Sequence, residues 1–382
     1  MGFSGVFAAN GEQWRRQRPM VMAGFDPAHI KSYFPALVKV TQRLAGRWKR
    51  AVSAGQAIDL QADLMRYTVD VTAGLAFGSD INTLQSNDDV IQRHLDKVLP
   101  VLFRRLMAPF AYWRWLKLPS DRALGKHLAA LHRAVDGFIA QARERMQGDP
   151  SLRARPTNLI EAMIAARDAG GSGLDDADVA GNVLTMLLAG EDTTANTLAW
   201  MIYLLSRNPK AMQRARDEVR AVLGEKPLPT QYDELSALAF VEACAHETMR
   251  LKPVAPVIIN EAVRDSVVGG IEVPKGALVV CLMRPPAVDE RHFPDAQAFD
   301  PARWLADGRA TSSAKRVAMP FGAGPRLCPG RYLAILEMKM AIAMLLAGFE
   351  VESVSTPDGT EPREHLALTM SPVGLRMRLR VR

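Results

Sequence analysis

The sequence FGAGPRLCPG, residues 321–330, sets one cysteine, Cys328, in a loop rich in glycine and proline, directly before a predicted helix that begins at Arg331. Glycine residues let the backbone turn tightly and let its N–H groups approach a sulfur atom closely. These N–H groups, together with the start of a helix, stabilise a thiolate relative to a thiol. The segment therefore predicts a loop that offers one sulfur ligand to a metal.

A single thiolate forms only one bond to a metal, so the remaining ligands have to come from a group other than protein. Haem is the candidate because it brings four nitrogens of its own. The alternative is a buried cysteine in a glycine turn, which is the commoner role of a lone cysteine. The other cysteines, Cys244 and Cys281, are distant in sequence, which excludes a disulfide framework and a C-x-x-C zinc site and favours a reducing compartment.

Composition limits the class of protein that can hold this loop. With 48% hydrophobic and 23% charged residues, the chain is globular and can bury a substantial core. No apolar run approaches the length that spans a bilayer, and residues 1–10 lack the basic leader and apolar block of a signal peptide. The net charge of +7 favours an acidic partner. Because the basic residues are scattered along the chain, we expect no nucleic-acid binding and favour an electron-transfer protein as that partner.

Most of the chain has the hydrophobic periodicity of helices separated by short loops. We find no internal repeat and no linker that would divide it, so the pattern predicts one α-dominated domain over residues 1–382. Strand signals are few and come late, with a glycine turn at residues 269–270. Helices are predicted at residues 11–23, 35–54, 60–77, 88–106, 121–146, 158–169, 175–207, 209–223, 235–252 and 331–348, and strands at 263–268, 271–273, 278–282 and within 366–381.

A second informative segment lies inside the longest predicted helix. Its flanks, residues 183–189 and 200–205, are apolar on nearly all sides, which is typical of a buried central helix. Between them, AGEDTT (residues 189–194) includes Gly190, which costs about 1 kcal/mol relative to alanine inside a helix. Buried carboxylates are also costly unless they are paired or used. The segment predicts either a polar patch that faces a neighbouring helix or a functional site.

Three further patterns carry little information alone. Glu247 and Arg250 share one helix face, as many solvated ion pairs do. The segment FDPARW, residues 299–304, follows and includes Arg303. In WRRQR, residues 14–18, Trp14 and Arg18 lie one helical turn apart, which also suits an exposed basic helix.

Together these segments resemble the motifs of the cytochrome P-450 monooxygenases, from about residue 5 to the C-terminus. The loop matches the family's F-x-x-G-x-R-x-C-x-G pattern, and AGEDTT is similar to its oxygen-activation motif, [A/G]-G-x-[D/E]-T-[T/S]. The other three resemble its W-x-x-x-R, E-x-x-R and F-x-P-x-R-[W/F] motifs, and all five occur in order. The resemblance implies a mainly α cytochrome P-450 fold, which is a helix-rich single domain with a small β region.

The resemblance also implies a haem b cofactor whose iron is bound by the Cys328 thiolate. Trp14, Arg18 and Arg326 would then face the haem propionates. Phe321 would shield the sulfur and tune its electron donation. The small pair in the central helix would leave room for dioxygen. The full set of implied haem contacts is Trp14, Arg18, Ala189, Gly190, Phe321, Gly322, Arg326, Cys328 and Gly330.

In the same family the acid and the alcohol of the central helix deliver protons to bound oxygen, which assigns these roles to Asp192 and Thr193. A buried network of Glu247, Arg250 and Arg303 would lock the loop before the cysteine, with backbone carbonyls as further partners. Residues 110–115, FAYWRW, form either loop packing or the mouth of an apolar pocket. The residues expected to line that pocket are Val183, Met186, Leu187, Val254, Val257 and Met370.

The implied activity is monooxygenation: one oxygen atom of O2 enters a lipophilic substrate, with electrons from a separate ferredoxin and its reductase. The alternatives are a peroxide-using haem-thiolate enzyme and a non-catalytic or haem-free fragment. Compared with the family, little sequence precedes Trp14, so we expect a chain truncated at its N-terminus, without the first two helices and much of the small sheet. A cytoplasmic, bacterial location is expected, with a membrane anchor in the missing segment left open.

Overall fold

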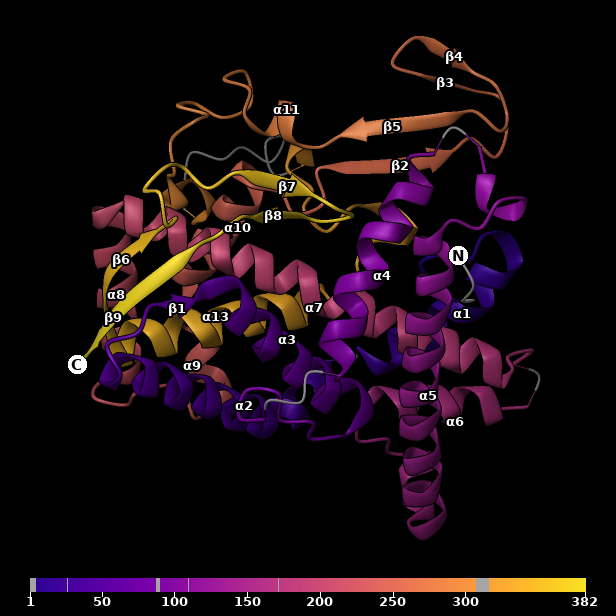
Figure 1. The fold of residues 1–382 in the computed structure, drawn as a ribbon, viewed down its shortest axis with the longest axis horizontal. Coiled ribbons are helices and arrows are strands. Elements are labelled where there is room, and N and C mark those ends of the chain that lie inside the picture. The colour runs from indigo at the N-terminus through magenta and orange to yellow at the C-terminus, as the bar shows by residue number, and fades with distance from the viewer. Residues whose placement is uncertain (1–4, 26, 87–89, 109, 171, 307–315) are drawn as a thin grey trace.

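The computed structural model describes residues 5–25, 27–86, 90–108, 110–170, 172–306 and 316–382. The longest helix, α7 (Asp176–Arg207), crosses the middle of the molecule (Figure 1). It begins with a capping box, in which the Asp178 N–H donates to Asp175 Oδ1 at 2.8 Å and the Asp175 N–H donates to Asp178 Oδ2 at 3.2 Å. Nearly every residue from Val179 to Leu205 is buried, as its apolar flanks predict.

The other helices pack around α7 or extend from it. They are α1 (Gly11–Gly24), α2 (Pro27–Ser53), α3 (Leu60–Phe77), α4 (Val90–Leu106), α5 (Pro119–Gly148), α6 (Leu159–Asp168), α8 (Pro209–Leu223), α9 (Tyr232–Ser236), α10 (Ala239–Leu251), α11 (Arg284–Ala287) and α13 (Arg331–Gly348). Of the helices in the described part of the chain, none combines the length and the apolar character needed to cross a bilayer.

Helix positions agree with the sequence pattern, and two boundaries differ for local reasons. The predicted helix over residues 235–252 is two elements, because α9 ends at Ser236 and α10 begins at Ala239. Helix α2 starts at Pro27 and keeps Pro35 in its interior, where the sequence pattern placed a helix start. The first two residues of the predicted helix 88–106 lie outside the described residues.

Within the described residues, the β structure consists of four small antiparallel sheets. Strands β1 (Ile58–Asp59), β9 (Arg376–Val381) and β6 (Phe349–Ser355) form one sheet in the order β1–β9–β6. The pairs are β2 (Val257–Glu261) with β5 (Leu278–Leu282), β3 (Ser266–Val268) with β4 (Ile271–Val273), and β7 (Glu364–Leu366) with β8 (Met370–Pro372). Strands β1, β2 and β6 were not predicted.

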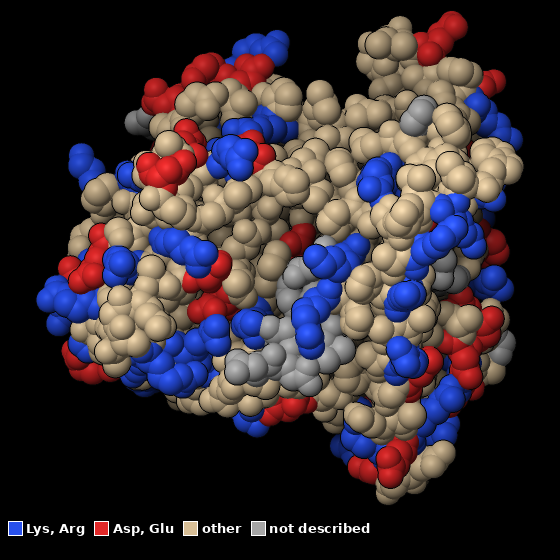
Figure 2. All heavy atoms as spheres, viewed as in Figure 1, with Lys and Arg blue, Asp and Glu red and all other residues tan. Residues whose placement is uncertain are grey.

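The excursion from β2 to β5 stands out from the body of the molecule at the upper right of Figure 1. Several of its apolar side chains are exposed, and the surface over it is largely uncharged in Figure 2. Elsewhere on this face, basic and acidic side chains are interspersed. The exposed apolar residues of the excursion are Val263, Val267, Val268, Ile271, Leu278, Val280 and Leu282.

Candidate functional site

Cys328 lies at the end of its loop, three residues before the first residue of α13, and is half-buried. Its N–H donates to the Phe321 carbonyl at 2.9 Å, which closes the loop into a compact turn. Gly322 and Gly324 have φ values of +73° and +65°, in the region that side chains with a Cβ rarely adopt. The glycines are therefore needed for the backbone path that brings the cysteine to this point.

The surroundings of the Cys328 sulfur act in opposite directions on its ionisation. Burial raises the pKa of the thiol and outweighs the other effects in the metal-free protein. Hydrogen bonds from the backbone N–H groups of Gly330 and Arg331, and the positive charges of Arg18 and Arg331, lower it. Metal binding replaces the thiol proton, so these groups then stabilise the charge of the thiolate.

Helix α1 lies directly beside the cysteine loop. The Arg18 guanidinium donates to the Leu327 carbonyl at 2.5 Å. The Arg326 guanidinium lies over the Trp14 ring, 4.7 Å from its centroid, and donates at 3.0 Å to the Ala9 carbonyl. Burial lowers the pKa of Arg18, which remains a cation at neutral pH. The structure therefore brings Trp14, Arg18 and Arg326 together at the cysteine.

A buried glutamine fixes α1 against the start of α7. Gln17 Nε2 donates to Asp178 Oδ1 at 2.6 Å, and Asn182 Nδ2 donates to Gln17 Oε1 at 3.3 Å. Gln17 and Asn182 have no exposed surface. This contact holds the helix that carries Trp14 and Arg18 in a fixed position relative to the central helix.

The polar segment of α7 opens a short accessible strip on an otherwise buried helix. Ala189 is exposed, and Leu188, Gly190 and Thr193 are partly exposed. Ala189 and Thr193 share one face because they are four residues apart, and the Thr193 hydroxyl donates to the Ala189 carbonyl at 2.8 Å. Helix α13, which begins just after the cysteine loop, packs against α7. The strip therefore offers a small side chain and a hydroxyl on the surface of the central helix.

Gly190 has a packing role in addition to the one predicted for it. A Cβ at this position would lie 2.8 Å from Thr72 Oγ1 and 3.2 Å from Thr72 Cγ2 of α3. Its small size is therefore required for the close packing of α3 against α7. Gly190 is also partly exposed at the strip, so the expectation that both residues make room for a ligand stays a prediction.

Exchange of Gly190 for alanine tests this packing role. In the wild-type background, Gly190→Ala should destabilise the protein by about 1–3 kcal/mol, because the β-branched, buried Thr72 cannot easily move away. In a Thr72→Ala background the same change should stabilise it by up to about 1 kcal/mol, because alanine is the better helix former. Urea unfolding of the four proteins measures both effects, and an equal cost in both backgrounds would contradict the packing role.

Of the residues predicted to line an apolar pocket, four keep some accessible surface and two have almost none. Met370 and Val254 are brought together by a hydrogen bond from the Met370 N–H to the Val254 carbonyl at 2.8 Å. Val254 and Val257 are partly exposed, and Met186 and Met370 retain 7% and 6% of their surface.

Val183 and Leu187 have only 0% and 1% of their surface exposed and pack in the hydrophobic core. A side chain without accessible surface does not line an open pocket, so the expectation for these two residues is corrected. The helical period explains the difference, because both lie on faces of α7 turned away from Ala189 and Thr193.

In the aromatic segment between α4 and α5, some rings pack against neighbours and others are exposed to solvent. Tyr112 and Trp113 pack edge to face, with ring centroids 5.2 Å apart, and the Arg105 guanidinium lies 5.1 Å from the Trp113 ring. Phe110 and Trp115 are 62% and 79% exposed. The segment thus includes both packed rings and rings that are open to solvent.

Glu247 is the centre of a fully buried charge network. Its carboxylate accepts hydrogen bonds from Arg250 at 2.7 and 2.8 Å and from Arg303 at 3.0 Å. The Trp304 indole and the Asp300 N–H complete its shell at 2.8 and 3.0 Å. The remaining guanidinium N–H groups donate to the carbonyls of Ala287, Ala296, Ala298, Pro294 and Asp295.

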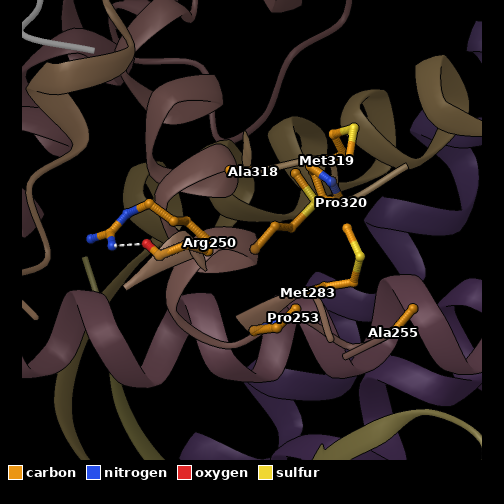
Figure 3. A pocket seen from close by; sticks show the side chains of 9 residues that line it. Arg250, Pro253, Ala255, Met283, Ala318, Met319 and Pro320 are labelled. Carbon is orange, nitrogen blue, oxygen red and sulfur yellow. Dashed lines mark hydrogen bonds between the residues drawn. The ribbon is translucent and has the colours of Figure 1, made fainter. Parts of the chain in front are cut away.

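A small pocket adjoins this network between the end of α10, α11 and residues 318–320, just before the cysteine loop (Figure 3). It encloses about 10 Å³, which is room for at most one water molecule. Its walls include Arg250, Met283, Met319 and Pro320. This pocket is too small for an organic substrate. Because Arg250 and residues 318–320 line it together, the charge network lies next to the segment that leads to Phe321.

The sequence analysis missed two side chains that hold Asp192. Asn196 Nδ2 donates to Asp192 Oδ1 at 2.9 Å, and the hydroxyl of Thr369, in the β7–β8 turn, donates to Asp192 Oδ2. The spacing of Asp192 and Asn196, four residues apart in a helix, was a signal for the first contact. The second joins residues 177 positions apart, so no local pattern indicates it.

Comparison with known proteins identifies the family. A cytochrome P450 family model matches residues 3–377, and the chain belongs to this family. Cytochrome P450 4F6 of Rattus norvegicus is 30% identical over 97% of this chain and 70% of its own length. Pentalenene oxygenase of Streptomyces avermitilis is 29% identical over 96% of this chain and 78% of its own length. Leukotriene-B4 omega-hydroxylase 3 of Mus musculus is 28% identical over 97% of this chain and 72% of its own length.

Solved structures agree with this assignment. The heme domain of cytochrome P450DA matches with a TM-score of 0.83 and 25% sequence identity, over 99% of this chain and 80% of that chain. The protein is therefore a P450-type oxidoreductase with the P450 fold, of a family that binds haem through a cysteine thiolate.

The residues around Cys328 fit a haem. The sulfur is partly accessible and accepts two backbone hydrogen bonds, as a metal-bound thiolate requires. Two guanidinium groups beside the loop, Arg18 and Arg326, suit the two carboxylates of the macrocycle. Among the described residues, no cluster of three or more His, Cys, Asp or Glu side chains is placed to hold a metal ion.

Proposed function

We propose that this chain is a haem-dependent monooxygenase that inserts one oxygen atom of O2 into a lipophilic organic substrate. The observation that carries the proposal is the Cys328 sulfur, which is partly accessible, held by two N–H groups and flanked by cationic side chains. Haem b would supply the binding and reductive activation of O2. Cys328 would bind its iron, Arg18 and Arg326 would hold the propionates, and Trp14 lies under the Arg326 guanidinium.

Within this proposal, two side chains of α7 hold and deliver the protons that the reaction with O2 consumes. Thr193 presents its hydroxyl on the accessible strip of α7, next to the small side chain of Ala189. Asp192, which is 9% exposed, lies on the neighbouring face as the proton donor to this site. The buried residues on both sides would limit the access of bulk water, so that these side chains would direct the protons to the reacting oxygen.

The proposed substrate class follows from the apolar residues at the site. Leu188, Met186, Val254, Val257 and Met370 offer hydrocarbon surface and no charge. The names of two relatives denote oxidation of leukotriene B4 and of pentalenene, which supports a lipophilic substrate for this chain as well.

The electrons would come from separate redox proteins, for which we propose an acidic ferredoxin and its reductase. The net charge of +7 supports an acidic partner. Arg15 and Arg16 of α1 are exposed, Arg15 beside Glu12 and Arg16 beside the Gly173 carbonyl, and we propose that their charges contribute to such docking. The three cysteines are unpaired, which supports a reducing compartment such as the cytoplasm.

Isotope labelling tests the proposed reaction. The purified enzyme is supplied with NADPH, a ferredoxin, its reductase and 18O2, and fatty acids and terpenes are offered as substrates. Incorporation of one 18O atom into a product, dependent on NADPH, supports the proposal. Incorporation only from labelled hydrogen peroxide would identify a peroxide-using enzyme. Absence of haem in the purified chain, or of product with either oxidant, would contradict the proposal.

Loss of the Thr193 hydroxyl should uncouple electron consumption from product formation. Thr193→Ala should lower product per NADPH by roughly tenfold or more, with the difference released as hydrogen peroxide or water, because the proton route loses a positioned hydroxyl. Thr193→Ser, which keeps the hydroxyl, serves as the matched control. Measurement of NADPH, product and peroxide in one reaction checks this, and unchanged coupling in the alanine variant would contradict the role of Thr193.

A further inference from the structure

Asp192 is held from two directions. Asn196, on the same helix, donates to Oδ1, and Thr369 donates to Oδ2 from a separate element, the β7–β8 turn. Asn196 is fully buried, and its own Oδ1 accepts a hydrogen bond from Gln61 Nε2 of α3 at 2.8 Å. Asn196, itself held by Gln61, therefore orients one carboxylate oxygen of Asp192, and the Thr369 hydroxyl orients the other.

The turn that carries Thr369 has an unusual backbone. Leu368 has a φ of +129°, which a residue with a Cβ adopts at a cost of order 1–3 kcal/mol. The Ala367 N–H donates to the Thr369 carbonyl at 3.1 Å, and the Met370 N–H donates to the Val254 carbonyl at 2.8 Å. These bonds hold the strained conformation from both sides, so the Thr369 hydroxyl is kept directed at α7.

The same turn contributes to the wall of the proposed substrate pocket. Met370 follows Thr369 directly and is bonded to Val254, another proposed wall residue. Strand β8, which begins at Met370, contacts α7. A substrate that contacts Met370 therefore acts on the residue directly after Thr369, whose hydroxyl contacts Asp192.

We propose that Thr369 is a positioning residue, which fixes the orientation of the Asp192 carboxylate beside Thr193 and makes it depend on the state of the pocket wall at Met370. This inference rests on the proposed function. A hydroxyl that donates to an ionised carboxylate forms a strong, directional bond. Without it, the carboxylate keeps its bond to Asn196 but loses the hydrogen bond that orients Oδ2.

Misplaced protons have a defined chemical result. When the O–O bond is not cleaved, O2 takes up two electrons and two protons and leaves as H2O2. When it is cleaved, one oxygen atom enters the substrate and the other leaves as water. Release of peroxide per O2 consumed therefore measures how well Asp192 and Thr193 direct the protons.

Three variants separate the hydroxyl from other properties of the turn. Thr369→Val removes the hydroxyl and keeps the shape, and Thr369→Ser keeps the hydroxyl. Ser371→Ala is a matched control in the same hairpin, because the Ser371 hydroxyl donates to the His365 carbonyl and not to α7. Dodecanoate is the substrate probe, and a plant-type ferredoxin and its reductase deliver electrons from NADPH.

Thr369→Val should raise the peroxide released per O2 by several-fold and lower kcat by roughly tenfold, with little change in KM. This is a smaller effect than the 10²–10⁴-fold loss expected when an acid or base is itself removed. Thr369→Ser and Ser371→Ala should behave as wild type. The double variant Thr369→Val/Asp192→Asn should release no more peroxide than Asp192→Asn, because both changes act through one carboxylate.

Amide hydrogen exchange gives a readout that does not depend on turnover. The Met370 amide should exchange faster in Thr369→Val, which removes the anchor of the turn, and to a smaller extent in Asp192→Asn, which replaces a charged acceptor by a neutral amide. It should exchange at the wild-type rate in Thr369→Ser. Wild-type peroxide yield and exchange in Thr369→Val, or additive effects in the double variant, would overturn the inference. A wild-type enzyme that consumes no O2 with NADPH would contradict the proposed function itself, whereas the exchange rates would still report on the contact between Thr369 and Asp192.

Discussion

Replacement of Cys328 by alanine should remove the strongly red-shifted Soret band that the wild-type enzyme is expected to show when its haem is reduced and bound to carbon monoxide. That band depends on electron donation to the iron from a thiolate ligand. Monooxygenation should be abolished in the same variant, because the sulfur is the one protein donor proposed for the iron. Absorption spectra of the dithionite-reduced protein, before and after carbon monoxide, measure this.

A second cysteine variant separates ligand loss from general damage. Cys281, in β5, is partly exposed and has no proposed role, so Cys281→Ser should keep the red-shifted band and the activity. Cys328→Ser tests whether an oxygen donor can replace the sulfur, and we expect a band at shorter wavelength and no turnover. Retention of the red-shifted band in Cys328→Ala would disprove the assignment of Cys328 as the ligand.

Sequence alone predicted the parts of the site that depend on local structure. The cysteine loop, the i, i+4 relation of Trp14 and Arg18, and the polar segment of α7 are each encoded within a few residues. Helical periodicity also predicted the central helix, since its apolar flanks leave no solvent face. Local signals of this kind need no knowledge of what packs against them.

The errors and omissions arise where packing between distant segments decides the outcome. Gly190 belongs to a helix–helix contact with Thr72, and a sequence motif does not show which face of a helix meets which neighbour. Val183 and Leu187 were assigned to the pocket by proximity in sequence, although the helical period turns them into the core. Strand β1 forms only because it pairs with β9, which lies more than three hundred residues later in the chain. Strand β6 also pairs with β9, and a bulge interrupts its register.

Thr369 shows the same limit for function. Its neighbours in sequence are mostly apolar and lie within a predicted strand signal, and only the fold places its hydroxyl against Asp192. The positive φ of Leu368 is equally invisible to sequence, because leucine is not a residue that favours such a conformation. Residues that act on a site from a separate element therefore have to be found in the structure.

Exchange of Glu247 for glutamine should prevent stable folding and haem retention, although it changes one atom of the side chain. Arg250 and Arg303 have only 1% of their surface exposed, and the carboxylate is the common anion that both guanidinium groups contact. Loss of one partner from a buried ion pair costs about 3–5 kcal/mol, because the remaining charge stays desolvated. With total stabilities of about 5–15 kcal/mol, this is a large share.

The surface pair of Glu350 and Arg380 provides the matched comparison for Glu247→Gln. Their side chains are 42% and 67% exposed, so Glu350→Gln should change stability by at most about 1 kcal/mol. Soluble yield, thermal unfolding and the carbon monoxide spectrum are measured for both variants. Glu247→Gln should give little soluble, haem-loaded protein, and any that is obtained should unfold at a clearly lower temperature. Equal melting temperatures for the two variants would show that the carbonyl shell of Arg250 and Arg303 holds the network without its anion.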